Sequence, residues 1–223
     1  IPITIGLLSN KGEEISSNET ILFSKKRQSF TYNDLPSKPI PSILRDFSAP
    51  VSLIQHLSND ELQILASHDT NLFNRWDCLR NLSLKAIERL IYNGVPISNL
   101  LLSSIYKLIR DTNLEPAYRA LVATPPSPQS ILNHLTAQGR SINPSIIFDT
   151  WRVFNKALAT ECAAYLSENL NKNPKSLTYE PTAKQSGIRA LELRLMDLFC
   201  YIENSAEVPK NLFKTASNMT EEM

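Results

Sequence analysis

The sequence predicts a mostly helical α+β protein, with a partial antiparallel β-sandwich at residues 1–57 and an irregular α-helical solenoid of helical hairpins at 58–223. Two observations lead to this fold class. Hydrophobic residues recur with period two in the first part and with period 3.6 from Ser58 onward. The strands have no helix between them, which favours antiparallel pairing over a parallel sheet. We find no constant repeat length, so no regular repeat family is indicated.

The first part contains five short segments with strand character, which are rich in β-branched and aromatic residues and bounded by turn signals. They are Ile3–Leu7, Ile21–Phe23, Phe30–Tyr32, Ile43–Phe47 and Val51–Ile54. Such a set leaves open sheet edges, which proteins normally pair or cover. We therefore expect partner strands to precede the first residue. The chain also stops in helical sequence, so both ends look cut.

The second part shows repeated helix-start signals. Ser58 and Glu61 have the spacing of a capping box, and Gly94 stands where a helix would end in a left-handed residue. Prolines recur near other expected starts, where a missing N–H costs nothing. The eight expected helices are one that begins at Ser58, then 71–93, Ser98–Asp111, Pro116–Ala123, Pro128–Gln138, Pro144–Asn171, Thr182–Asn204 and Pro209–Ser217.

Composition argues against two classes of partner. The 23 Lys and Arg against 22 Asp and Glu give a formal net charge of +1, so no global field favours nucleic acid or anionic lipid. No apolar run approaches the roughly 20 residues that a membrane helix needs. Cys78, Cys162 and Cys200 are far apart and each falls in an expected helix, which fits buried, reduced thiols. We therefore predict a cytoplasmic protein with no nucleic-acid or membrane partner.

The histidines do not form a metal motif. Only three occur, and His56, His68 and His134 are followed by Leu, Asp and Leu, so no H-E-x-x-H pair exists. His68 with Asp69 is better explained as a polar helix end at the surface than as part of a metal site. No closely spaced cysteine pair and no phosphate-binding glycine loop occurs either. The sequence therefore predicts no metal-binding and no cofactor-binding residue in this chain.

Nucleophile and base arrangements are also missing. No G-x-S-x-G elbow is present. The carboxylates Asp69, Asp77, Glu161 and Glu192 lie beside basic residues, as solvated ion pairs usually do. The sequence therefore predicts no catalytic residue. The aromatic residues at helical spacing are expected in the core, and these are Trp76, Phe148, Trp151, Phe154 and Tyr165.

Several segments carry a resemblance to a known family. The chain is similar, in the same order, to zinc aminopeptidases of the aminopeptidase N type in the region C-terminal to their catalytic domain. The matching segments cover nearly the whole chain and are Pro2–Leu7, Phe47–Val51, Phe73–Asp77, Ala157–Glu161 and Ser217–Thr220. In such gluzincin metallo-aminopeptidases, the resemblance implies a small Ig-like β-sandwich followed by a helical domain that caps the active-site chamber.

The resemblance implies that the full-length parent enzyme binds zinc and that this part of it does not. The zinc motif and the G-x-M-E-N segment of the family are absent, so no family catalytic residue can be assigned here. The implied partners are the upstream catalytic domain of the same chain and, in the parent, the peptides whose N-terminal residues it removes. We expect Arg75 and Asp77 to anchor the two domains to each other. The alternative is a free-standing α-helical scaffold that binds a protein partner.

Overall fold

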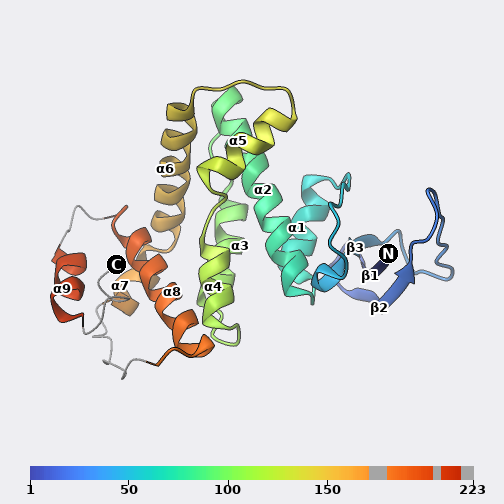
Figure 1. The fold of residues 1–223 in the computed structure, drawn as a ribbon, viewed down its shortest axis with the longest axis horizontal. Coiled ribbons are helices and arrows are strands. Elements are labelled where there is room, and N and C mark those ends of the chain that lie inside the picture. Colours follow the sequence, from blue (N-terminus) through green and yellow to red (C-terminus); the bar gives the residue numbers. More distant parts are fainter. Residues whose placement is uncertain (171–179, 203–206, 217–223) are drawn as a thin grey trace. The chain divides into compact units, whose positions relative to one another are not determined.

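The computed structural model describes residues 1–170, 180–202 and 207–216. It divides into two compact units, Ile1–Ser83 and Leu84–Met223. The first contains a small antiparallel sheet and the second is helical (Figure 1). The predicted fold class is therefore confirmed. The predicted domain boundary between residues 57 and 58 stays a prediction.

The sheet has three strands, β1 (Pro2–Leu8), β2 (Glu14–Leu22) and β3 (Ile40–Ile43). Their order is β2-β1-β3 and both pairings are antiparallel. Side chains alternate across a strand, so the odd-numbered residues of β1 share one face. On that face Ile5 and Leu7 form a core cluster with Ile21 of β2. On the opposite face, Gly6 lies against the side chain of Arg45.

Two of the five predicted strands are not strands. Phe30–Tyr32 and Val51–Ile54 have no ladder pairing. Tyr32 and Leu35 pack against the core of the sheet. The apolar residues of Phe30–Tyr32 therefore indicate a segment that covers the sheet and not a strand within it. The expected strand Ile43–Phe47 is also wrong beyond its first residue, because Arg45–Phe47 forms the 3-10 helix η1.

The first helices begin where the sequence indicates. Helix α1 (Asn59–His68) starts with a capping box in which Ser58 accepts from the N–H of Glu61 and Glu61 accepts from the N–H of Ser58. Helix α2 (Leu72–Asn93) ends at Gly94, which has φ +64° as a left-handed C-terminal residue requires. These predictions are confirmed because the signals act within one helical turn.

The second unit continues with seven more helices in the described residues. They are α3 (Asn99–Arg110), α4 (Pro116–Ala123), α5 (Pro128–Ala137), α6 (Pro144–Glu161), α7 (Ala163–Leu170), α8 (Ala183–Phe199) and α9 (Glu207–Thr215). Helix α4 packs along α8 and against α3, and α7 also contacts α8 (Figure 1). Proline is the first residue of α4, α5 and α6, as predicted.

One long predicted helix is broken in two. The sequence predicts a single helix over Pro144–Asn171, but α6 stops at Glu161 and α7 starts at Ala163. Cys162 lies between them and is fully buried, as are Leu158 and Leu166 on either side. No glycine or proline marks this site, so packing and not local sequence sets the break. The predicted ends at Asn171, Asn204 and Ser217 lie outside the described residues.

The aromatic core prediction holds only in part. Phe154 of α6 is fully buried, while Trp76, Trp151 and Tyr165 are half-buried. Phe148 is 56% exposed, so its predicted place in the core is wrong. It lies on the outer side of α6, where its ring contacts Trp151 at 6.0 Å between centroids. Helical spacing alone does not separate such a flanking position from the buried stripe.

Candidate functional site

The first unit is organised around a buried arginine. Arg45 of η1 has no exposed surface and donates to four side-chain oxygens. Its Nε lies 3.0 Å from Ser42 Oγ and its Nη2 lies 2.9 Å from Asp69 Oδ1. Its Nη1 lies 2.6 Å from Glu14 Oε1 and 2.5 Å from Asn18 Oδ1. Arg45 thus joins β2, β3 and the residue that follows α1.

Asp69 is the main counter-charge and is only 1% exposed. The prediction of a surface helix end is therefore wrong for Asp69. Its carboxylate accepts from Arg45, from the hydroxyl of Ser42 and from the backbone N–H of Asn71 at 2.9 Å. Three donors stabilise the ionised carboxylate in place of water. His68, the neighbouring residue, stays exposed.

Two asparagines extend this network to the start of α2. Asn74 donates to Ser42 Oγ at 2.7 Å and to the carbonyl of Ile43 at 3.0 Å. Asn71 donates to Asp46 Oδ1 at 2.6 Å and accepts from the N–H of Asn74 at 3.1 Å. These contacts join β3 and η1 to the first turn of α2. Below, the buried junction means Ser42, Arg45, Asp69 and Asn74.

Gly6 makes room for the buried junction. A Cβ atom at this position of β1 would lie 2.0 Å from Arg45 Cζ. The guanidinium therefore lies flat on the backbone of the central strand. Gly12 lies in the turn between β1 and β2 and has φ +83°. A Cβ atom at Gly12 would lie 2.3 Å from Cγ of His68, so the imidazole ring also packs closely on this glycine.

The Ser42 hydroxyl of the buried junction has all its hydrogen-bonding sites occupied, so it is not a reactive nucleophile. A serine attacks a substrate when a neighbouring base takes its proton and leaves a lone pair free. The Ser42 hydroxyl already donates to Asp69, and its oxygen accepts from Arg45 and Asn74. A hydroxyl has one donor and two acceptor sites, so all of them are occupied. The arrangement fixes the sheet to α1 and α2.

The predicted anchors Arg75 and Asp77 have other roles. Arg75 donates from Nε to the carbonyl of Ala66 and from Nη2 to that of Ser67, both at 3.2 Å, and so caps the end of α1. Asp77 accepts from Asn81 one turn along α2 at 3.1 Å. Burial raises its pKa, against the opposing effects of nearby Arg80 and of Asn81. Strand and helix are linked instead by Arg45, which the sequence does not single out, and by Asp69, for which it predicts a surface position.

Buried arginines cap helix ends in the second unit as well. Arg119 of α4 donates from Nε to the carbonyl of Ile109 near the end of α3 at 2.7 Å, and from Nη2 to Tyr165 Oη at 2.6 Å. Arg194 of α8 donates to the carbonyl of Ala123, the last residue of α4, at 2.9 and 3.0 Å. Terminal carbonyls of a helix lack intrahelical partners, so a buried end needs such donors.

A row of three aromatic rings lies beside the buried junction. The rings of Phe47 and Phe73 are 5.6 Å apart between centroids, and those of Phe73 and Trp76 are 5.8 Å apart. Phe47 is 51% exposed. We call Phe47, Leu72, Phe73 and Trp76 the aromatic row. It combines the residue after Asp46 with the first two turns of α2.

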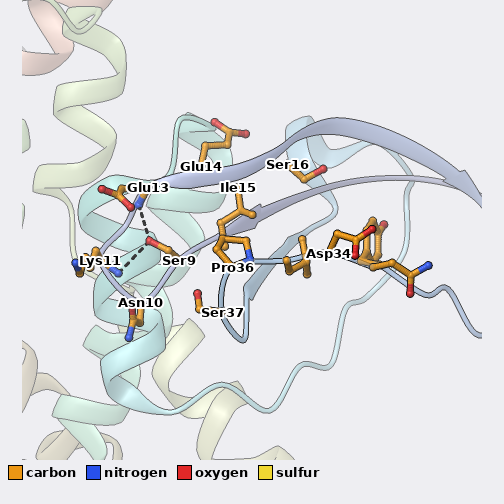
Figure 2. Close-up of a pocket in the computed structure, with 13 residues that line it drawn as sticks. Ser9, Asn10, Lys11, Glu13, Glu14, Ile15, Ser16, Asp34, Pro36 and Ser37 are labelled. Carbon is orange, nitrogen blue, oxygen red and sulfur yellow. Dashed lines mark hydrogen bonds between the residues drawn. The ribbon is translucent and has the colours of Figure 1, made fainter.

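A polar pocket of about 670 Å³ lies in the first unit (Figure 2). It is formed by the turn between β1 and β2, the start of β2 and the segment 32–37. Ser9 accepts from the backbone N–H groups of Lys11 and Glu13, both at 3.1 Å, and so holds the turn. The lining carries one cation, Lys11, and three carboxylates, of which Glu14 is bound by Arg45. Histidine and cysteine do not occur in this lining.

The described ranges show no grouping of metal ligands. Within residues 1–170, 180–202 and 207–216, no three His, Cys, Asp or Glu side chains come together to hold a metal ion. His134 of α5 instead pairs with Glu88 of α2 at 3.1 Å. Burial raises the pKa of the Cys78 and Cys162 thiols to about 12. Cys200 is exposed, so the prediction that all three thiols are buried is wrong for this residue. None of the described helices has the length and hydropathy of a membrane span.

Family models match both parts of the chain. Residues 59–223 match DUF3458_C, a domain of unknown function with ARM repeats. Residues 1–56 match DUF3458, a domain of unknown function with an Ig-like fold. The matches meet between the sheet and α1, so the buried junction joins residues from both family models.

Individual relatives are aminopeptidases. Aminopeptidase N of Escherichia coli is 28% identical over 99% of this chain and 26% of its own length. Aminopeptidase N of Caulobacter vibrioides is 32% identical over 55% of this chain and 14% of its own length. The crystal structure of Legionella pneumophila aminopeptidase A in complex with aspartic acid is similar with a TM-score of 0.83 and 25% identity, over 100% of this chain and 27% of that chain.

The chain spans about a quarter of the length of the relatives that it matches along nearly all its residues. The matched region of this chain covers the sheet and the described helices. The chain therefore belongs to the DUF3458_C family and is an aminopeptidase N C-terminal region.

Proposed function

We propose that this chain is a non-catalytic part of a zinc aminopeptidase that removes N-terminal amino acids from peptides. In that enzyme the chain forms part of the wall that caps the active-site chamber. Its partners are the catalytic domain of the same polypeptide and, through the enzyme, peptide substrates. The reduced cysteines favour a cytoplasmic location.

One observation carries the proposal. The E. coli aminopeptidase N is similar along 99% of this chain, yet the chain has no H-E-x-x-H motif in any of its 223 residues. A zinc peptidase of this class needs that motif to hold the metal and to place a general base beside it. The chemistry of the relative therefore belongs to the three quarters that this chain does not match. Catalytic, metal and cofactor residues are accordingly assigned to none of the positions here.

The first experiment separates the chain from the whole enzyme. We expect the polypeptide of residues 1–223 to hydrolyse no amino-acid arylamide with zinc added. The whole aminopeptidase polypeptide should hydrolyse these substrates and lose the activity when a chelator removes zinc. Chelator-sensitive turnover by residues 1–223 alone would contradict the non-catalytic assignment. A whole polypeptide that is inactive with zinc would contradict the aminopeptidase assignment.

The cap is tested by substrate length. A wall around the active site should restrict long peptides more than short arylamides. Removing residues 84–223 from the whole polypeptide should therefore raise the ratio of kcat/KM for a ten-residue peptide to that for an arylamide at least five-fold. The arylamide activity reports whether the catalytic part stays folded. An unchanged ratio with the arylamide activity retained would contradict the cap.

A further inference from the structure

The aromatic row is a partly exposed apolar surface of the first unit. Phe47 is 51% exposed and Leu72 is 37% exposed. Phe73 and Trp76 are half-buried and continue the surface along the first two turns of α2. Aromatic side chains with this exposure are enriched where one protein surface binds another. The aromatic row is therefore a candidate docking surface.

The backbone around Phe47 is conformationally strained and holds its side chain in this exposed position. Leu44, Asp46 and Phe47 have φ values of 65°, 55° and 51°, in the left-handed region that residues other than glycine rarely adopt. The buried junction holds this segment, because Arg45 points inward and Asp46 is bound by Asn71. The turn that buries Arg45 thus also presents the ring of Phe47 outward. A docking surface built in this way is preorganised.

We propose that the aromatic row docks on the zinc-bearing part of the same aminopeptidase polypeptide, an inference that rests on the function proposed above. The relatives that share this region have about three quarters of their length outside it. The zinc chemistry belongs to that remainder, because this chain has no zinc motif. The occupant is therefore a folded domain joined covalently to this chain.

The size of the aromatic row favours a covalently joined partner over a second copy. A stable interface between separate proteins buries about 800 Å² on each side and uses about 20 residues or more. The aromatic row has four residues. A partner in the same polypeptide is held at high effective concentration, so a few anchor residues suffice to fix its orientation. The rigid buried junction beside the row then transmits that orientation to α1 and α2.

The test uses the whole aminopeptidase polypeptide with the photo-crosslinking analogue p-benzoylphenylalanine in place of Phe47. This analogue keeps the phenylalanine ring, and the position is half exposed, so the fold should be retained. After irradiation and digestion, mass spectrometry identifies the peptide joined to position 47. We expect an intramolecular crosslink to the part that carries the zinc motif. The same analogue in place of Leu72 should reach the same part and serves if the first variant does not fold.

Tyr92 provides the matched control. It is an aromatic residue of the same helix, is 42% exposed and follows Trp76 by sixteen residues, about 24 Å along α2. The analogue in place of Tyr92 should give at least five-fold less crosslink to the peptides found from position 47. An equal yield from both positions would mean that the contact is not specific and would overturn the proposal.

The remaining outcomes decide between occupants. A crosslink from position 47 to any segment other than the part that carries the zinc motif, a crosslink between two copies or the absence of a crosslink would each overturn the proposal. Arylamide hydrolysis by the same preparations separates this inference from the function on which it rests. An active, zinc-dependent enzyme without the crosslink contradicts only the docking surface. An inactive unmodified polypeptide contradicts the proposed function.

Discussion

Nη2 of Arg45 lies 2.9 Å from Oδ1 of Asp69, and neither side chain exposes any surface to solvent. A buried charge pair stabilises a fold only when its remaining hydrogen-bonding sites are also satisfied. Here Ser42, Glu14 and Asn18 accept three more of the five guanidinium hydrogens, and the N–H of Asn71 donates to the carboxylate. The pair therefore fixes how the sheet meets α1 and α2.

Removing Asp69 should destabilise the first unit strongly. Asp69→Ala leaves the fully buried guanidinium of Arg45 without its buried counter-charge, and breaking one side of such a pair costs about 3–5 kcal/mol. Urea unfolding of the 223-residue chain, followed by the fluorescence of Trp76 in a Trp151→Phe background, measures the change. The matched control is Lys38→Met, which breaks the exposed 4.0 Å pair with Glu61 and should cost less than about 1 kcal/mol. Equal effects of the two variants would contradict the role of the buried pair.

Gly6→Ala should have a comparable effect on the same unit. The added methyl group would lie 2.0 Å from Arg45 Cζ, so the guanidinium must leave its four acceptors or β1 must shift. We expect a loss of at least about 3 kcal/mol in the free energy of unfolding. Gly94→Ala is the control, because no atom lies within 4 Å of a Cβ added at this position. Only the backbone strain of φ +64° remains, which costs about 1 kcal/mol. If the Gly6→Ala protein were as stable as the control, this would contradict the packing of the Arg45 guanidinium on Gly6.

Glu88 should make the helical unit sensitive to acid. Burial raises the pKa of Glu88, but hydrogen bonds from Gln138 and His134 and the charge of Arg140 outweigh it, so the pKa lies below its ordinary value of 4.5. A lowered pKa in the folded state means stability that is present above pH 4.5 and lost as the pH falls through the lowered value. Glu88→Gln should therefore weaken the acid dependence of the free energy of unfolding below pH 4.5.

Circular dichroism of urea unfolding between pH 3 and pH 7 measures this dependence. The control is Glu168→Gln on α7, a change of the same chemistry at an exposed side chain. Its acid dependence should match that of the unmodified chain. If Glu88→Gln also matched the unmodified chain, the contacts from α5 and Arg140 would contribute nothing to stability.

The three thiols should differ in reactivity. Burial raises the pKa of Cys78 and Cys162 to about 12, so both stay protonated and covered at pH 8. Cys200 is exposed. Titration of the folded chain with a chromogenic disulfide reagent should therefore release one equivalent rapidly, and all three after unfolding in urea. Cys200→Ser should abolish the rapid phase. A rapid phase that survives this change would show that a buried thiol is accessible.

Local signals gave the helix starts correctly, while pairing between distant residues was harder to predict. Ser58 and Glu61 cap α1 because their side chains reach backbone groups three residues away. The same reasoning cannot find Arg45 and Asp69, which are 24 residues apart and meet only when the sheet and α1 are both formed. The sequence predicts a surface position for Asp69, because a lone carboxylate at a helix end is usually solvated.

The sequence by itself determined the change from strands to helices, the helix starts, the near-neutral charge and the absence of a zinc motif. Each of these depends on residue identity or on contacts within one helical turn. The tertiary structure decided the buried junction, the break between α6 and α7 at Cys162 and the exposure of Phe47 and Phe148. The physical reason is that burial depends on which surfaces meet, and residues far apart in the chain supply those surfaces.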